Sequence, residues 1–251
     1  RAAARALGTQ RNVEALTTAA TTPTEPVRKA IADALGKSAG PASARTLVSM
    51  ASTDINPDIR AAALSSLGRV SPQEALRLAR KNTRLTGQEN KRLVGSSMRI
   101  LSNHGEARDL RLLTDTRLPL GNHIAGVDAA ARWVQSQADP VLREQYGPTV
   151  ARFAEPLLSD VDLRTRQRAI GVLRRVGDEQ SIPFLEAHRR ATRVESEQES
   201  ARSAIRAIRE RERPDFVDPA AERDAQLAEL EDRLDALEKE LDHWETHGAV
   251  Q

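Results

Sequence analysis

The sequence has no cysteine and very few aromatic side chains. Of its 251 residues, 2% are Phe, Trp or Tyr. The absence of cysteine excludes disulfides, thiol nucleophiles and thiolate metal sites, and it leaves the redox compartment unassigned. Ala, Leu, Arg and Glu dominate instead, which favours helices packed through small and aliphatic side chains over sheets. We therefore expect an all-α protein.

Long apolar runs are also missing. No stretch approaches the roughly 20 residues that a membrane span needs, and the first ten residues, "RAAARALGTQ", lack the apolar core of a signal peptide. The sequence thus predicts no membrane association and favours a cytoplasmic location, without assigning one. The chain starts at Arg1 in the middle of a repeating pattern, which suggests a fragment of a longer protein.

Charge is divided unevenly along the chain. Residues 218–247 contain 11 Asp or Glu and three Arg or Lys, a net charge of −8, whereas the whole chain carries +2. A basic body is therefore followed by an acidic tail.

Two stretches, "VRKAIADALGK" (27–37) and "IRAAALSSLGR" (59–69), follow the same pattern 32 residues apart. Large aliphatic or alanine side chains recur at every fourth position, which places one apolar stripe along a helix of about three turns. Each stretch ends in glycine, Gly36 or Gly68, and we expect these residues to end their helices in the left-handed conformation.

The pattern extends over most of the chain. The last large aliphatic residue of each presumed helix serves as a marker, and successive markers lie 28, 32, 34, 33, 39 and 35 residues apart. The markers are Leu7, Leu35, Leu67, Leu101, Val134, Leu173 and Ile208. A second apolar-periodic segment precedes each later marker helix, so each unit is predicted to be a helix pair.

Helix starts support this division. Ser71 and Glu74 have the spacing of a capping box, Asn56 and Asp139 each precede a proline suited to the first turn, and Asp178 follows a glycine.

The recurring motif, hydrophobic-Arg-x-x-Ala-hydrophobic-x-x-Leu-Gly, resembles the second helix of a HEAT repeat, with its best copies at 27–36 and 59–68 and a third at 165–185. The resemblance covers about 1–213 and implies an α-solenoid. Arg28, Arg60 and Arg166 occupy the motif's arginine position. The resemblance implies a structural role for them, paired with an acid of an adjacent repeat; the candidate acids are Asp33, Asp54, Asp58 and Asp162.

The tail has a different period. Its apolar residues alternate steps of three and four, as heptad a and d positions do; they are Leu227, Leu230, Leu234, Leu237, Leu241 and Trp244. The pattern lasts about three heptads. It predicts an amphipathic helix that either caps the last repeat, helped by opposite charge, or forms a short coiled coil and a weak homodimer.

Catalytic motifs are absent. The histidines form no HExxH, no glycine-rich phosphate loop occurs, and "LGNHIAG" (120–126) is unsupported as a nucleotide site. His243 and His247 have an i, i+4 spacing that can hold a metal, which we attribute to chance. We therefore expect no metal, no other cofactor and no catalysis in this chain.

One cluster of positive charge stands out, between residues 76 and 99, where a single acid, Glu89, interrupts seven basic residues. They are Arg77, Arg80, Lys81, Arg84, Lys91, Arg92 and Arg99. We expect this candidate patch to bind another protein or another domain. Nucleic acid is less favoured, because the cluster contains no aromatic side chain for base stacking.

The order of parts is similar to the C-terminal region of aminopeptidase N-like zinc metallopeptidases, whose solenoid limits access to a catalytic domain. The family's HExxH and GxMEN signatures are absent, so the resemblance transfers no catalytic residue. A HEAT-like lyase or DNA glycosylase is a further alternative. Only Trp133, Asp128 and Asp139 could supply the aromatic and acidic side chains that its site would need.

These observations predict an α-solenoid of about six to seven HEAT-like helix pairs over 1–213, a linker at 214–218 and an acidic helix at 219–247. The expected function is that of a protein-interaction scaffold, either as a domain that shapes access to a peptidase active site or as a free-standing adaptor. The partner is another domain of the parent chain or a separate polypeptide.

Overall fold

The computed structural model describes residues 13–21, 24–38, 40–212 and Arg233. Within these ranges the chain contains helices and no strand, as the composition predicts. The predicted Leu7 marker and, apart from Arg233, the acidic tail lie outside the described residues.

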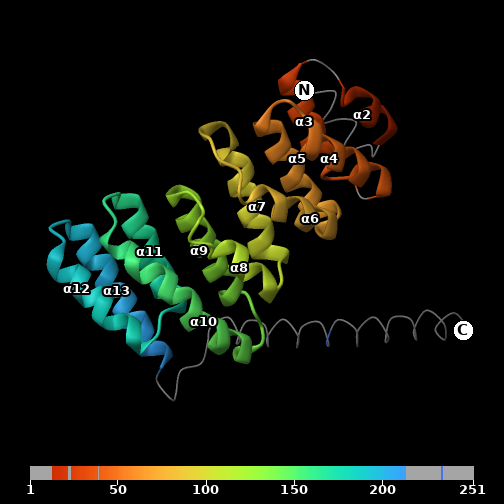
Figure 1. Cartoon of the computed structure of the whole chain (residues 1–251). Coiled ribbons are helices and arrows are strands. Elements are labelled where there is room, and N and C mark those ends of the chain that lie inside the picture. Colours follow the sequence, from red (N-terminus) through yellow and green to blue (C-terminus); the bar gives the residue numbers. More distant parts are fainter. Residues whose placement is uncertain (1–12, 22–23, 39, 213–232, 234–251) are drawn as a thin grey trace, which may run out of the picture.

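The helices alternate between two layers and stack side by side in one row (Figure 1). The even-numbered layer contains α2 (Val13–Ala19), α4 (Pro41–Thr53), α6 (Pro72–Asn82), α8 (Leu110–Leu113), α10 (Pro140–Ala154) and α12 (Ile182–Ala191). The odd-numbered layer contains α3 (Glu25–Leu35), α5 (Pro57–Val70), α7 (Lys91–His104), α9 (Leu120–Gln135), α11 (Leu163–Val176) and α13 (Glu195–Arg211). Each odd-numbered helix packs against the next odd-numbered one, which is the arrangement of an α-solenoid.

Short 3₁₀ helices join or extend several of these elements. They are η1 (Gln88–Asn90), η2 (Ala107–Asp109), η3 (Glu155–Ser159) and η4 (Glu179–Ser181). The longest marker interval, from Val134 to Leu173, contains both α10 and η3, whereas the first helix of the preceding unit shrinks to η2 and α8. These two irregularities both lie in the even-numbered layer.

The core runs along the seam between the layers. All six markers within the described residues are buried, and all of them except Val134 are fully inaccessible to solvent. Each apolar stripe is covered by neighbouring helices, so each pair is stabilised mainly by the pairs beside it. The helix-pair repeat read from the marker positions is confirmed for these units.

The predicted left-handed conformation of the motif glycines is wrong, although α3 does end at Gly36. Gly36 has φ −66°, an ordinary helical value, and Gly68 lies inside α5, where it is buried. A Cβ atom on Gly68 would lie 2.4 Å from Ile100 Cδ1 of α7, and one on Gly36 would lie 2.6 Å from Ser66 Oγ of α5. These glycines therefore let adjacent odd-numbered helices approach closely.

The predicted helix caps are confirmed except at Ser71. Asn56 accepts a hydrogen bond from the Asp58 N–H at 2.8 Å, and Asp139 accepts one from the Val141 N–H at 2.9 Å. Ser71 makes no such bond, and the Glu74 carboxylate instead accepts two from Arg77, so no capping box forms.

A glycine inside α9 allows a prediction. A Cβ on Gly126 would lie 2.1 Å from the Leu113 carbonyl oxygen, whereas one on Gly95 of α7 would meet no atom within 4 Å. Gly126→Ala should lower the free energy of unfolding by about 1–3 kcal/mol, because backbone must move to accommodate the methyl group. Gly95→Ala is the matched control and should raise it by about 0.5–1 kcal/mol. Urea denaturation measures both, and equal effects would contradict the close approach of α8 and α9.

Candidate functional site

Arg28, the first of the three motif arginines, is held by a buried carboxylate of the next unit. Its Nε and Nη2 donate to the two carboxylate oxygens of Asp54 at 2.8 and 3.0 Å, and the side chains are 10% and 5% exposed. Burial alone would raise the pKa of Asp54, but hydrogen bonds from Arg28 and the Asn56 N–H outweigh it and lower that pKa from its ordinary value. The pair joins α3 to the chain between α4 and α5.

Arg166 makes the corresponding contact with a different acid. Its Nε donates to Glu197 Oε1 at 2.9 Å, and Glu197, on α13, is fully buried. Asp162, considered as a partner from the sequence, instead accepts from the Thr165 N–H and caps α11. The sequence did not identify this acid because Arg166 reaches the next odd-numbered helix, 31 residues ahead.

Arg60 departs from this scheme, since no carboxylate in the described part of the chain accepts a hydrogen bond from it. It donates to the Asp54 carbonyl at 2.9 Å and to Asn90 Oδ1 at 3.2 Å. Asp58 of α5, another candidate acid, pairs instead with Arg92 of α7 at 2.6 Å.

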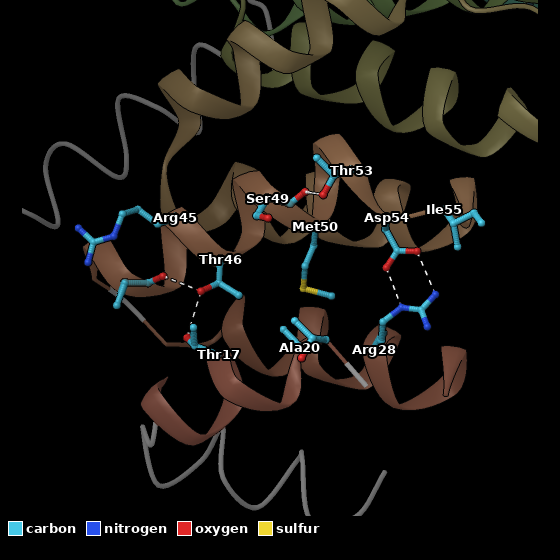
Figure 2. A pocket seen from close by; sticks show the side chains of 12 residues that line it. Thr17, Ala20, Arg28, Arg45, Thr46, Ser49, Met50, Thr53, Asp54 and Ile55 are labelled. Carbon is cyan, nitrogen blue, oxygen red and sulfur yellow. Dashed lines mark hydrogen bonds and ion pairs between the residues drawn. The ribbon is translucent and has the colours of Figure 1, made fainter. Parts of the chain in front are cut away.

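Two open grooves lie beside the motif arginines. The first, of about 640 Å³, separates α2 from α4, with Thr17 and Thr46 at one end and the Arg28–Asp54 pair at the other (Figure 2). The second, of about 540 Å³, lies between η3 and α12 and includes Arg166. In both grooves the arginine is already held by a carboxylate, so its charge is not available to a ligand.

The structure does not gather the basic residues of 76–99 into one unpaired patch. Four of the seven already have an acidic neighbour: Arg77 with Glu74, Arg80 with Asp109, Arg84 with Asp115 and Arg92 with Asp58. The residues are also divided between α6 of one layer, the loop that contains Arg84, and α7 of the other layer. Asp109 is nearly buried, so the Arg80 pair mainly joins α6 to η2.

A different basic surface lies along the odd-numbered layer. On each of four helices, residues spaced three or four apart form a stripe that remains accessible to solvent. The stripes are Asp58, Ala62, Ser65 and Arg69 on α5; Arg92, Ser96, Arg99 and Asn103 on α7; Ala125, Asp128 and Arg132 on α9; and Arg164, Arg168, Gly171 and Arg175 on α11. We call this set the odd-helix face.

Contacts between helices place these stripes next to one another. The Asp58–Arg92 pair and the Ser65 Oγ to Ser96 Oγ distance of 3.2 Å join α5 to α7. Asp128 of α9 pairs with Arg175 of α11 and, at 3.0 Å, with Arg132 of its own helix.

The odd-helix face has a clear excess of positive charge. It contains seven arginines and two aspartates, and both aspartates are already paired with arginine. Arg99, Arg164 and Arg168 are exposed, and none of them forms an ion pair with another described residue. Such a surface attracts a negatively charged partner.

A sequence signal for this face exists. Arg99 and Arg132 each lie two residues before a marker, and their separation of 33 residues equals that marker interval. Residues of this face recur at nearly equal offsets from the markers, whereas the residues of 76–99 are close only along the sequence.

The remaining chemical candidates form no site. His123 is buried, and burial lowers its pKa from the ordinary value. Trp133 is a core residue that donates to the Gly105 carbonyl at 2.8 Å, while Asp128 is ion-paired and Asp139 is a helix cap. His243 and His247 lie outside the described residues.

In the part of the chain that the structure describes, no group of three or more His, Cys, Asp or Glu residues is placed to hold a metal ion. No helix among the described residues is long and apolar enough to cross a membrane.

Comparison with known proteins agrees with this architecture. A family model described as HEAT repeats matches residues 1–68. No curated protein matches the chain.

Solved structures extend the likeness of fold to most of the chain. An engineered protein of the Northeast Structural Genomics Consortium is similar with a TM-score of 0.53 and 16% identity, over 79% of this chain and 96% of that one. A computationally designed armadillo repeat protein for modular peptide recognition is similar with a TM-score of 0.51 and 14% identity, over 77% and 98%. The protein therefore has the fold of a HEAT- or armadillo-like α-solenoid.

Proposed function

We propose that the chain is a non-catalytic protein-interaction scaffold whose odd-helix face binds an acidic segment of a partner polypeptide. The observation that carries the proposal is the charge of this face, where seven arginines accompany two aspartates. A rigid row of helices presents these arginines at repeated positions, which suits an extended partner. The designed armadillo protein similar in fold is described as made for peptide recognition, which supports a peptide ligand.

The proposal is tested by selection from a randomised linear peptide library. Peptides enriched on the wild-type chain should be rich in Asp and Glu. The triple variant Arg99→Glu, Arg164→Glu and Arg168→Glu should bind them about tenfold or more weakly, because attraction becomes repulsion. Isothermal titration calorimetry at two salt concentrations measures the change.

A matched control changes the same amount of charge elsewhere. Arg45, Lys81 and Arg111 are exposed on α4, α6 and α8 of the even-numbered layer. Their triple replacement with Glu should leave peptide affinity within about twofold. Peptides without an acidic bias, or equal losses in both triple variants, would contradict the proposal. Tighter binding of a duplex oligonucleotide than of the selected peptides would indicate nucleic acid as the partner instead.

In a narrower form of the proposal, the chain is the C-terminal solenoid of an aminopeptidase N-like metallopeptidase and limits the access of substrates to its active site. It rests on the order of parts in the sequence, and the comparisons provide no such relative. An aminopeptidase assay of the parent protein with and without residues 1–251 separates this form from a free-standing adaptor. A change in preferred peptide length on deletion supports the access-limiting role.

A further inference from the structure

The last described helix pair carries a second basic surface, distinct from the odd-helix face. One side of α13 packs on α11, where Glu197 accepts from Arg166 and Arg211 donates to the Gly177 carbonyl at 2.8 Å. The other side, with part of α12, forms an open groove of about 430 Å³. Its lining includes Arg189, Arg202, Arg206 and Arg209 around Ile205. We call it the terminal groove.

Positive charge in the terminal groove is only partly balanced. Its acids are Glu186 and Glu210. Arg209 approaches Glu186 at 3.8 Å, and Arg202 pairs with Glu199 at 3.3 Å. Arg206 is exposed and forms no ion pair with another described residue. A ligand for this groove should therefore be acidic, with an apolar side chain to meet Ile205.

We propose that the chain's own acidic segment, residues 218–247, binds in the terminal groove and covers the end of the solenoid. Its net charge of −8 complements the groove, and its leucines supply the apolar side chains. The described chain reaches Glu212, at the end of α13, so only residues 213–217 separate this helix from the segment along the chain. This inference is independent of the ligand proposed for the odd-helix face.

The lengths allow an antiparallel arrangement. Residues 213–217 can span about 17 Å when extended, which is enough to reverse direction. The 17 residues of α13 extend about 25 Å. A helix formed by residues 219–235 would have a similar length, and residues 218–235 contain seven acids and two arginines. The first half of the segment therefore suffices to cover the groove.

Cysteine cross-linking tests this contact cleanly, because the chain has no cysteine of its own. Arg206→Cys is combined in the full chain with one tail cysteine at a time, at Asp224, Ala228 or Glu231. Under mild oxidation, at least one combination should form an intramolecular disulfide, seen as a faster-migrating monomer on a non-reducing gel. Lys29→Cys, exposed on α3 in the first described pair, is the control anchor and should cross-link at least about tenfold more slowly.

Charge dependence is measured in the same cross-linking background. Adding Arg202→Glu and Arg209→Glu to the Arg206→Cys variant should slow disulfide formation about tenfold, whereas Arg45→Glu and Arg111→Glu should not. Equal rates at both anchors would overturn the proposal. Disulfide-linked dimers in place of intramolecular bonds would also overturn it, and would indicate a second copy as the occupant.

Discussion

Replacing Glu197 with alanine is expected to lower the free energy of unfolding by about 3–5 kcal/mol, because it leaves a partly buried guanidinium without its carboxylate. Glu197 is fully buried and accepts hydrogen bonds from Arg166 Nε at 2.9 Å and from Thr192 Oγ1 at 2.5 Å. Removal of the carboxylate also breaks the ion pair that joins α11 to α13. Chemical denaturation followed by circular dichroism measures the change.

Glu199 provides the control for this variant. It lies on the same helix and also pairs with an arginine, Arg202, but its side chain is 64% exposed. Glu199→Ala should change stability by about 0.5 kcal/mol or less, because solvent screens the pair. Similar losses of stability in both variants would show that burial does not strengthen the Arg166–Glu197 pair.

The same carboxylate makes stability depend on pH. Burial tends to raise the pKa of Glu197, but hydrogen bonds from Arg166 and Thr192 outweigh it, so the folded-state pKa lies below the ordinary value of 4.5. A lowered pKa means that the stabilisation is complete above the unfolded-state pKa and is lost as the pH falls through the folded-state value. Glu197→Gln should therefore flatten the acid side of the stability profile, and an unchanged profile would contradict this account.

Replacing Leu67 with alanine should have a similarly large effect, about 2–5 kcal/mol. Leu67 is a marker residue of α5 with no solvent exposure, at the seam where α5 meets α3, α4 and α7. The truncation leaves a cavity that rigid helices on several sides cannot fill. Thermal and urea denaturation measure the loss.

An exposed aliphatic residue of the same repeat serves as the control. Ile55, in the turn before α5, is 86% exposed (Figure 2). Ile55→Ala should leave the free energy of unfolding within about 0.5 kcal/mol of wild type. If Ile55→Ala costs as much as Leu67→Ala, the marker positions do not define the core.

The repeat architecture could be predicted from sequence because each helix pair encodes its own apolar stripe. Leu35, Leu67 and Leu101 recur at nearly constant spacing, and one local pattern predicts one buried seam. Contacts between units were harder to predict. The partner of Arg166 proved to be Glu197, and the close approach at Gly68 depends on Ile100 of the next helix.

The candidate binding surface illustrates the same limit. A cluster of charge along the sequence, such as 76–99, divides between two layers once the helices pack. Arginines that lie one repeat apart, such as Arg99 and Arg132, come to share a layer. The relevant neighbours in a solenoid are therefore residues at equal positions of successive repeats. Apart from Arg233, the acidic tail lies outside the described residues, and its heptad helix stays a prediction.

The most direct test of the central claim is photo-cross-linking of a selected acidic peptide to the full chain. A photoreactive residue at the centre of the peptide, followed by mass spectrometry, identifies the helices that it contacts. The account predicts cross-links on α7, α9 and α11 at the odd-helix face. Cross-links concentrated on the even-numbered layer, such as the groove between α2 and α4, would contradict it.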